Sequence, residues 1–128
     1  MKKRVTGLGG FFFKTEQPDA IKEWYGKHLG LPVDAYGCTF WWKDKDGNEC
    51  STQWSPFKED TSYFKPSEKQ FMMNFRVENL HELLEVLKAE GVTVVGEVEE
   101  YEYGKFGWIL DPEGNKIELW EPIDSAFK

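Results

Sequence analysis

The sequence has few of the residues from which disulfide frameworks and transition-metal sites are built. Its 128 residues include only two cysteines and two histidines. Cys38 and Cys50 flank a predicted turn at Asp46-Gly47, and strand alternation places their side chains on opposite faces of the hairpin, so we expect no disulfide between them. Neither cysteine belongs to a Cys-x-x-Cys pair, which argues against redox or zinc chemistry, and free thiols suit a reducing compartment.

Basic residues are also scarce. Lys and Arg number 16 against 23 Asp and Glu, and the formal net charge is -7 with a pI near 4.9. Binding to the backbone of a nucleic acid requires clustered Lys and Arg. Only Met1–Arg4 is locally basic, so we expect no nucleic acid as a partner.

The sequence has no long hydrophobic run. Val5–Gly10, which follows the basic residues, is too short and too rich in glycine for a signal peptide or a membrane span. It also lacks the lysine and the spacing of a phosphate-binding loop. Ser51 and Ser55 have no evident histidine base, which leaves a nucleophilic triad without support. We expect a cytoplasmic protein with no membrane partner.

Aromatic side chains, by contrast, are abundant. Aromatic residues make up 16% of the chain, with six Trp and ten Phe, and hydrophobic residues make up 40%. A chain of this length forms one domain with one sizeable core. We therefore expect a folded interior that is rich in aromatic rings.

A sequence pattern recurs about half a chain later. It consists of a tryptophan, a Gly-Asn pair six residues on, a second tryptophan and a proline, found at Trp41, Gly47-Asn48, Trp54 and Pro56 and again at Trp108, Gly114-Asn115, Trp120 and Pro122. This pattern predicts an internally duplicated domain with a ligand cavity between its halves.

Each half also contains a helical pattern. Residues of the expected buried stripe recur at i, i+3, i+4 and i+7, as Ile21, Trp24, Tyr25 and His28 and as Leu80, Leu83, Leu84 and Leu87. The predicted modules cover about residues 5–57 and about 70–122. The connector between them, about residues 58–69, carries Tyr63 and Phe64 either on the surface or across a cavity mouth.

One carboxylate lies within the last predicted hairpin. If Asp111 lies opposite Asn115, Trp108 lies across from Glu118, and alternation puts Glu118 and Trp120 on the face away from the helix. Such a glutamate is either a solvated surface residue or a pocket residue. In a desolvated pocket its pKa rises, which would suit proton transfer.

Segments over most of the chain resemble a known family: Phe11–Lys14 with Trp24–Leu31, then Phe75–Leu80, and finally Gly107–Trp120. The Asp-Pro-x-Gly-Asn-x-Ile-Glu-Leu run at Asp111–Leu119 is the most specific of them. The chain resembles the vicinal oxygen chelate superfamily, which includes glyoxalases, extradiol dioxygenases and bleomycin-resistance proteins. The resemblance implies an α+β fold of two βαβββ modules whose strands curl into a cup, commonly assembled as a homodimer.

Metal-using members of that family place four ligands in the cup, and the corresponding positions here are Gly10, Thr52, Met72 and Glu118. Only Glu118 is a strong ligand, whereas divalent transition metals need several His, Asp, Glu or Cys donors. His28 is expected in the core or at its boundary, and His81 on the surface. We therefore expect no metal site and no cofactor.

The predicted cup face combines aromatic walls with one carboxylate, and it comprises Phe12, Trp41, Trp54, Met72, Asn74, Trp108, Glu118 and Trp120. Such walls favour a flat or cationic organic ligand through stacking and cation-π contact. The first hypothesis is metal-independent binding of a small aromatic or cationic molecule. The second is a glyoxalase-like lyase or isomerase with Glu118 as general base or metal ligand, and the third is a structural dimer whose cup is closed.

Overall fold

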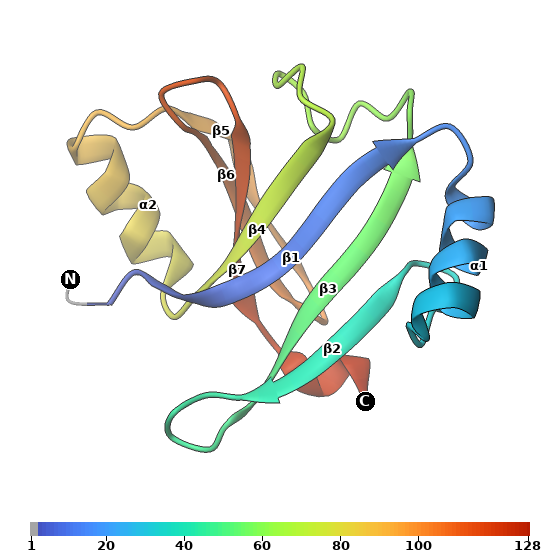
Figure 1. Cartoon of the computed structure of the whole chain (residues 1–128). Helices are drawn as coiled ribbons and strands as arrows, with labels where there is room; N and C mark the ends of the chain where they lie inside the picture. Colours follow the sequence, from blue (N-terminus) through green and yellow to red (C-terminus); the bar gives the residue numbers. More distant parts are fainter. Residues whose placement is uncertain (1–2) are drawn as a thin grey trace.

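The computed structural model describes residues 3–128, which form seven strands, two α-helices and a terminal 3-10 helix (Figure 1). In chain order these are β1 Val5–Thr15, α1 Pro18–Leu29, β2 Cys38–Lys43, β3 Glu49–Lys58, β4 Phe71–Val77, α2 Leu80–Ala89, β5 Val94–Tyr101, β6 Gly104–Leu110, β7 Lys116–Pro122 and η1 Asp124–Phe127. Among these residues, α1 and α2 are both too short and too polar to span a bilayer.

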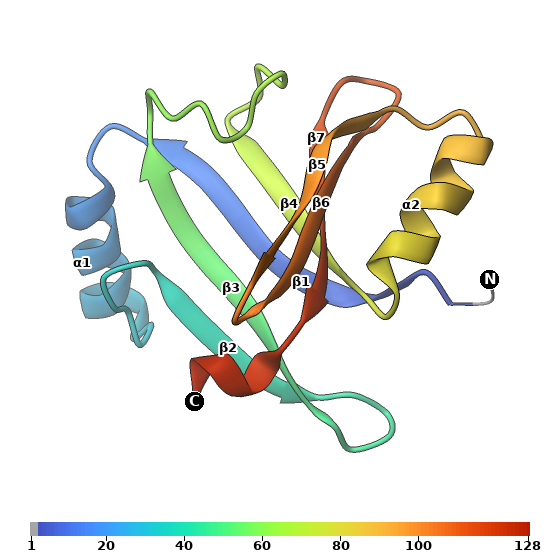
Figure 2. The same ribbon diagram turned by 180° about the vertical axis from the view of Figure 1, so that it is seen from behind.

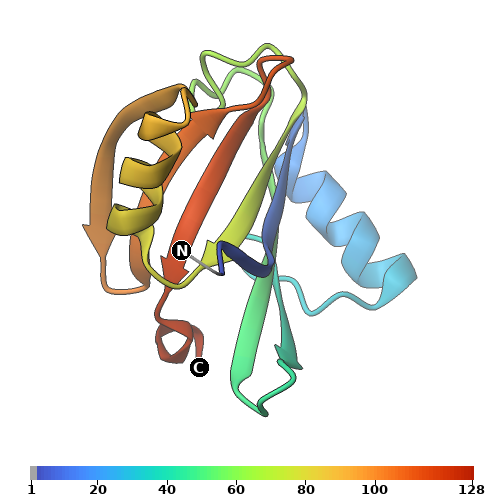
Figure 3. The same cartoon turned by 90° about the vertical axis from the view of Figure 1, so that its left-hand side faces the viewer.

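All seven strands belong to one open mixed sheet with the order β2-β3-β1-β4-β7-β6-β5. The two central strands, β1 and β4, are antiparallel to each other, and each has a parallel neighbour from its own half of the chain, β3 or β7. The sheet is strongly curved, and both helices pack on its outer face at opposite ends (Figures 1, 2 and 3). The predicted α+β cup is therefore confirmed.

The two halves differ in their number of strands. The second half follows the βαβββ order, whereas the first half contributes only β1, β2 and β3. Residues 30–37, where a further strand was expected from the family pattern, form a loop. Pro32 cannot donate a ladder hydrogen bond, and Asp34 Oδ1 accepts the backbone N–H groups of Tyr36 and Gly37 at 2.8 and 2.9 Å, which closes a turn there.

The buried stripe predicted for the second helix is present. Leu80, Leu83 and Leu84 of α2 are at most 5% exposed and pack with Val77 and Leu119 of the sheet. Full burial of such a leucine contributes about 1.5–3 kcal/mol. This helix therefore anchors the outer face of β5, β6 and β7.

The corresponding prediction for the first helix is wrong. No residue of α1 is buried, Trp24 is 51% exposed and His28 is exposed. Tyr25 packs against Trp54 of the sheet with tilted rings 4.7 Å apart, while Trp24 packs on His28 of the same helix. Of the predicted stripe, Ile21 and Tyr25 are half-buried, whereas Trp24 and His28 are exposed.

The first hairpin has a different register from the predicted one. Its turn is not the two-residue Asp46-Gly47 turn but a five-residue loop in which Asp44 N–H donates to Asn48 O at 3.0 Å. The same loop closes the last hairpin, between Asp111 and Asn115. Lys43 consequently pairs with Glu49 and Trp41 with Ser51.

This register also changes the placement of the two cysteines. Cys38 pairs with Trp54, and Cys50 pairs with Trp42. Both cysteines therefore lie on the same face, four residue pairs apart along the hairpin, not on opposite faces as predicted. They are buried and free of disulfides, as expected, and burial raises the pKa of both thiols.

Candidate functional site

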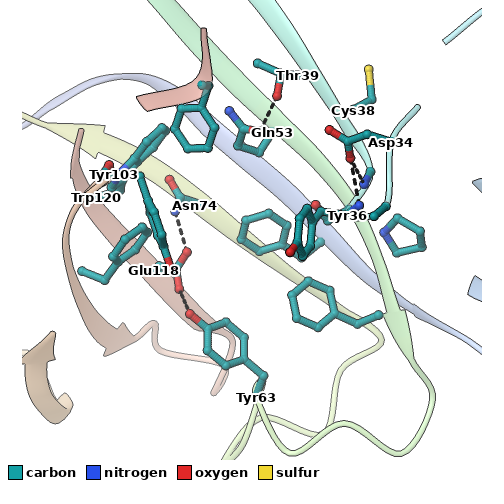
Figure 4. Close-up of a pocket in the computed structure, with 18 of the residues that line it drawn as sticks. Asp34, Tyr36, Cys38, Thr39, Gln53, Tyr63, Asn74, Tyr103, Glu118 and Trp120 are labelled. Carbon is teal, nitrogen blue, oxygen red and sulfur yellow. Dashed lines mark hydrogen bonds between the residues drawn. The ribbon is translucent and has the colours of Figure 1, made fainter. Parts of the chain in front are cut away.

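A cavity of about 700 Å³ occupies the inner face of the sheet, between its two halves (Figure 4). Its wall draws on strands β1, β2, β3, β4, β6 and β7, on the loop 30–37, on the connector after β3, on the turn between β5 and β6 and on η1. Eight of the 19 residues that line it are aromatic: Phe12, Tyr36, Phe57, Tyr63, Tyr103, Phe106, Trp120 and Phe127. The cavity volume falls within the range of small-molecule sites.

Four residues predicted for the cup face line this cavity: Phe12, Asn74, Glu118 and Trp120. Two others support its wall from behind. Met72 is fully buried, and Trp108, which is 5% exposed, packs in the same aromatic cluster as Phe12 and Trp120. They do not line the cavity themselves.

Two of the predicted tryptophans lie elsewhere. Trp54 lies on the outer face, 5.4 Å from the ring of Phe13, so its predicted place on the cup face is wrong. The prediction assumed that Trp41 pairs with Thr52, whereas the five-residue loop pairs Trp41 with Ser51 and turns Gln53, not Trp54, into the cavity. Trp41 is 40% exposed outside the cavity wall, where Lys128 lies over its ring at 5.9 Å.

Glu118 is the most constrained polar residue of the cavity wall. Its carboxylate is 1% exposed and accepts three hydrogen bonds. Asn74 Nδ2 donates to Oε1 at 2.6 Å, and the Tyr63 hydroxyl donates to Oε2 (Figure 4). Trp108 Nε1 also donates to Oε2, at 2.9 Å. The parallel pairing of β4 with β7 and the antiparallel pairing of β6 with β7 place Asn74 and Trp108 on either side of it.

Burial shifts the titration of this group. Desolvation raises the pKa of Glu118, and the donors Tyr63, Asn74 and Trp108 only partly oppose the shift. Desolvation also raises the pKa of Tyr63, and the neighbouring Glu118 charge raises it further. Both shifts disfavour the charged form of the side chain concerned.

Tyr63 is brought to the cavity by the connector between the halves. Its ring stacks on Phe57 at 5.6 Å and meets Trp108 edge-on at 6.2 Å. The Lys116 ammonium donates to the Tyr63 carbonyl at 2.7 Å and lies over the rings of Tyr63 and Trp108. Lys116 itself does not line the cavity. Of the two placements left open by the sequence, the structure has Tyr63 across the cavity wall.

The C-terminal segment closes another side of the cavity. The Arg76 guanidinium, buried in the sheet, lies over the rings of Trp42 and Trp120 at 5.5 and 5.4 Å and makes two 2.7 Å hydrogen bonds to Asp124. Asp124 also accepts hydrogen bonds from the N–H and hydroxyl of Ser51. These contacts hold η1 against both halves and place Phe127 in the wall.

Several lining residues were not predicted from the sequence, among them Gln53, Tyr36 and Phe127. The correct hairpin register would have placed Gln53 on the cavity face. That register is indicated by the Asp-x-x-Gly-Asn spacing, which the two hairpin loops share. Tyr36 lies in a loop and Phe127 in a terminal 3-10 helix. Neither segment carries a periodic pattern that identifies a face.

The four positions at which metal-using relatives carry ligands do not form a donor set here. The ring of Phe12 covers Gly10, Met72 is in the core, and Thr52 bonds to Leu8 O at 2.6 Å away from the cavity. Within residues 3–128, no three His, Cys, Asp or Glu side chains approach closely enough to bind a metal ion. The Glu118 oxygens already have protein donors, so these residues do not fit a four-ligand site.

Comparison with known proteins agrees with this architecture. Residues 10–120 match the glyoxalase-like domain family. A search of curated proteins found no match.

Solved structures of similar fold include methylmalonyl-CoA epimerases. The Mycobacterium tuberculosis enzyme is 21% identical with a TM-score of 0.66, covering 99% of this chain and 95% of that one. A variant of the Streptomyces coelicolor enzyme in complex with 2-nitronate-propionyl-CoA is 15% identical with a TM-score of 0.69, covering 92% and 98%. The family match over residues 10–120 confirms the resemblance inferred from the sequence, and these structures share its fold. With a family match over 10–120 and this shared fold, the chain belongs to the glyoxalase-like domain family.

Proposed function

We propose that this protein binds a small organic molecule of aromatic or cationic character in the cavity, without a metal ion. The observation that carries the proposal is a cavity of about 700 Å³ with an aromatic wall, whose single buried carboxylate already has three protein donors. Aromatic rings offer stacking area and attract cations to their faces. A carboxylate so engaged stabilises the wall more readily than it ligates a metal.

The test is a thermal-shift screen of chelator-treated protein against aromatic and amine-containing compounds. A ligand at ~100 times its dissociation constant stabilises the folded state by roughly 2.7 kcal/mol. Tyr36→Ala should weaken binding without loss of stability, because Tyr36 lines the cavity but is 84% exposed. Trp24→Ala, which removes an exposed ring on α1 outside the cavity, is the matched control.

A second candidate is a lyase or isomerase of the same fold. The observation that favours it is the hydrogen-bonded Tyr63–Glu118 pair at the cavity wall, where burial raises the pKa of the carboxyl. A raised pKa suits a group that exchanges protons near neutral pH. Exchange of a substrate C–H for deuterium in D₂O, abolished in Glu118→Gln, would establish this activity, whereas binding retained in Glu118→Gln without any exchange would favour the binding protein.

We also propose that the chain assembles as a homodimer. Large apolar side chains on β1 and β2 remain exposed, including Leu8 at 44%, Phe11 at 40% and Phe40 at 44%. Clustered exposed apolar residues are typical of interaction surfaces. Sedimentation equilibrium should give about 30 kDa, twice the chain mass of 15.0 kDa, and a mass of one chain would contradict the dimer.

A further inference from the structure

The charges that line the cavity have one sign. Asp34, Glu102 and Glu118 contribute carboxyl groups, and among the described residues no Lys, Arg or His lines it. Lys116 and Arg76 have other partners: Lys116 is held by the Tyr63 carbonyl, and Arg76 by Asp124. An anion would therefore find no cation in this wall, whereas a cation would meet the exposed carboxyl groups of Asp34 and Glu102.

Two tyrosines flank the mouth, each beside an acidic residue. On one side, the loop 30–37 carries Asp34 and Tyr36, and Tyr103 lies on the other (Figure 4). Tyr103 and its chain neighbour Glu102, which also lines the cavity, belong to the turn between β5 and β6. Asp34 Oδ1 accepts the backbone N–H groups of Tyr36 and Gly37, which fixes the first pair. Tyr103 is held by a stack on Tyr101 at 5.2 Å.

Tyr36 is unusual for an aromatic residue of a cavity wall. Its side chain is 84% exposed, and within the part of the chain that the structure describes its ring contacts no other ring. Covering the apolar surface of an exposed ring with a ligand removes it from water, which contributes favourably to the free energy of binding. On the opposite side, burial raises the pKa of Tyr103, and the charges of Glu118 and Glu102 raise it further, which reflects the negative potential of the mouth.

We infer that the ligand is an organic cation, a quaternary or protonated amine with an aromatic or apolar body. Its charged head lies between Tyr36 and Tyr103 near Asp34 and Glu102, and its body occupies the aromatic interior beside Phe106. Aromatic faces and carboxylates are the groups that recognise such cations in proteins. This inference rests on the proposed binding function and restricts the ligand to positively charged molecules.

The experiment compares three probes with one phenol body and heads of similar shape: para-hydroxyphenyltrimethylammonium, para-tert-butylphenol and para-phenolsulfonate. Calorimetric titration should show the cation bound at least about tenfold more tightly than the neutral probe, which equals about 1.4 kcal/mol. The sulfonate should bind most weakly. The preference for the cation should shrink as salt concentration rises, because exposed charges are screened.

Charge-removing variants sharpen the comparison. Asp34→Asn keeps the acceptor that closes the loop, and Glu102→Gln changes an exposed side chain. Each should weaken the cation several-fold and leave the neutral probe unchanged, while Glu23→Gln on the exposed face of α1 changes neither. Tyr36→Leu should also weaken the cation, and Tyr36→Phe should retain it because the ring face remains.

The outcomes separate the two proposals. Equal affinity for the ammonium and tert-butyl probes, or tighter binding of the sulfonate, overturns the inference and leaves the binding function intact. No binding of any probe, together with a negative thermal-shift screen, overturns both. Cation selectivity that persists in the double variant Asp34→Asn/Glu102→Gln shows that the charged head of the ligand does not lie near Asp34 and Glu102.

Discussion

Arg76 and Asp124 form a bidentate ion pair in which Nη1–Oδ1 and Nη2–Oδ2 are both 2.7 Å apart. The pair joins β4 to η1, and Asp124 also accepts two hydrogen bonds from Ser51 of β3. One carboxylate thus connects the C-terminal segment to both halves of the cup. Phe127 and the Trp120 ring, which meet edge-on at 5.8 Å, depend on this connection for their place in the cavity wall.

Asp124→Ala should lower the free energy of unfolding by about 3 kcal/mol, because it leaves Arg76 buried without its counterion. Asp19→Ala, which removes a fully exposed carboxylate that pairs with Lys22, should change it far less. Urea denaturation measures both. The double variant Arg76→Met/Asp124→Leu should lose less than Asp124→Ala, and a larger loss would contradict the ion-pair account.

The pH dependence of stability should reflect Glu118. Its pKa is raised in the folded state by desolvation, so the protonated form is favoured there. The stability that this shift contributes is fully present below the unfolded pKa of about 4.5 and is lost as the pH rises through the folded value. Glu118→Gln should lack this loss. Unfolding free energies of both proteins at a series of pH values measure it, and a difference that stays constant with pH would contradict the burial argument.

Tyr63→Phe should destabilise the fold by about 1–3 kcal/mol and raise the pKa of Glu118 further, since one donor to a buried carboxylate is lost. Tyr25→Phe is the matched control, because no hydrogen bond of the Tyr25 hydroxyl is seen within residues 3–128. Thermal unfolding and NMR titration of a labelled Glu118 carboxyl provide the two readouts. If both variants are equally stable, the Tyr63 hydrogen bond does not hold the wall.

Gly9→Ala should destabilise the fold by about 1–3 kcal/mol through crowding at the cup floor. A Cβ there would lie 2.1 Å from Asn74 Oδ1 and 2.9 Å from Trp120 Cε3. Because the closest atom belongs to a side chain, the cost should be smaller in an Asn74→Ala background. A double-mutant cycle measures this coupling, and strict additivity would argue against the contact.

Much of the second half could be predicted from the sequence. The Asp-Pro-x-Gly-Asn loop fixes the last hairpin, and the structure has Trp108 opposite Glu118 as that loop predicts. The leucine stripe of α2 is buried because all four positions are aliphatic and fit a flat sheet face. These features are local, since each depends on residues within one hairpin or one helix.

The first half was harder to predict, because its sequence is compatible with two different hairpin turns. Both a two-residue turn at Asp46-Gly47 and a five-residue loop from Asp44 to Asn48 suit the sequence, and they differ by one residue in register. That single step moves Trp54 from one face of the sheet to the other. Only the equivalence of the two Asp-x-x-Gly-Asn loops distinguishes the alternatives.

The rest of the site depends on contacts between distant residues. Tyr63 reaches Glu118 across 55 residues, and Arg76 reaches Asp124 across 48. Neither pairing leaves a periodic signal, because the connector and η1 have no extended stripe. Sequence patterns identified Glu118 as a pocket candidate but not the groups that hold it.

Calorimetric titration of chelator-treated protein with the compound that gives the largest thermal shift decides whether the cavity binds a ligand without a metal ion. We predict one molecule bound per chain, with the same dissociation constant before and after addition of Zn²⁺ or Co²⁺. Trp120→Leu should weaken binding at least about tenfold, since Trp120 lines the cavity, whereas Trp54→Phe on the outer face should leave it unchanged. Binding that appears only after a divalent metal is restored, or that is lost in Trp54→Phe and retained in Trp120→Leu, would contradict the account.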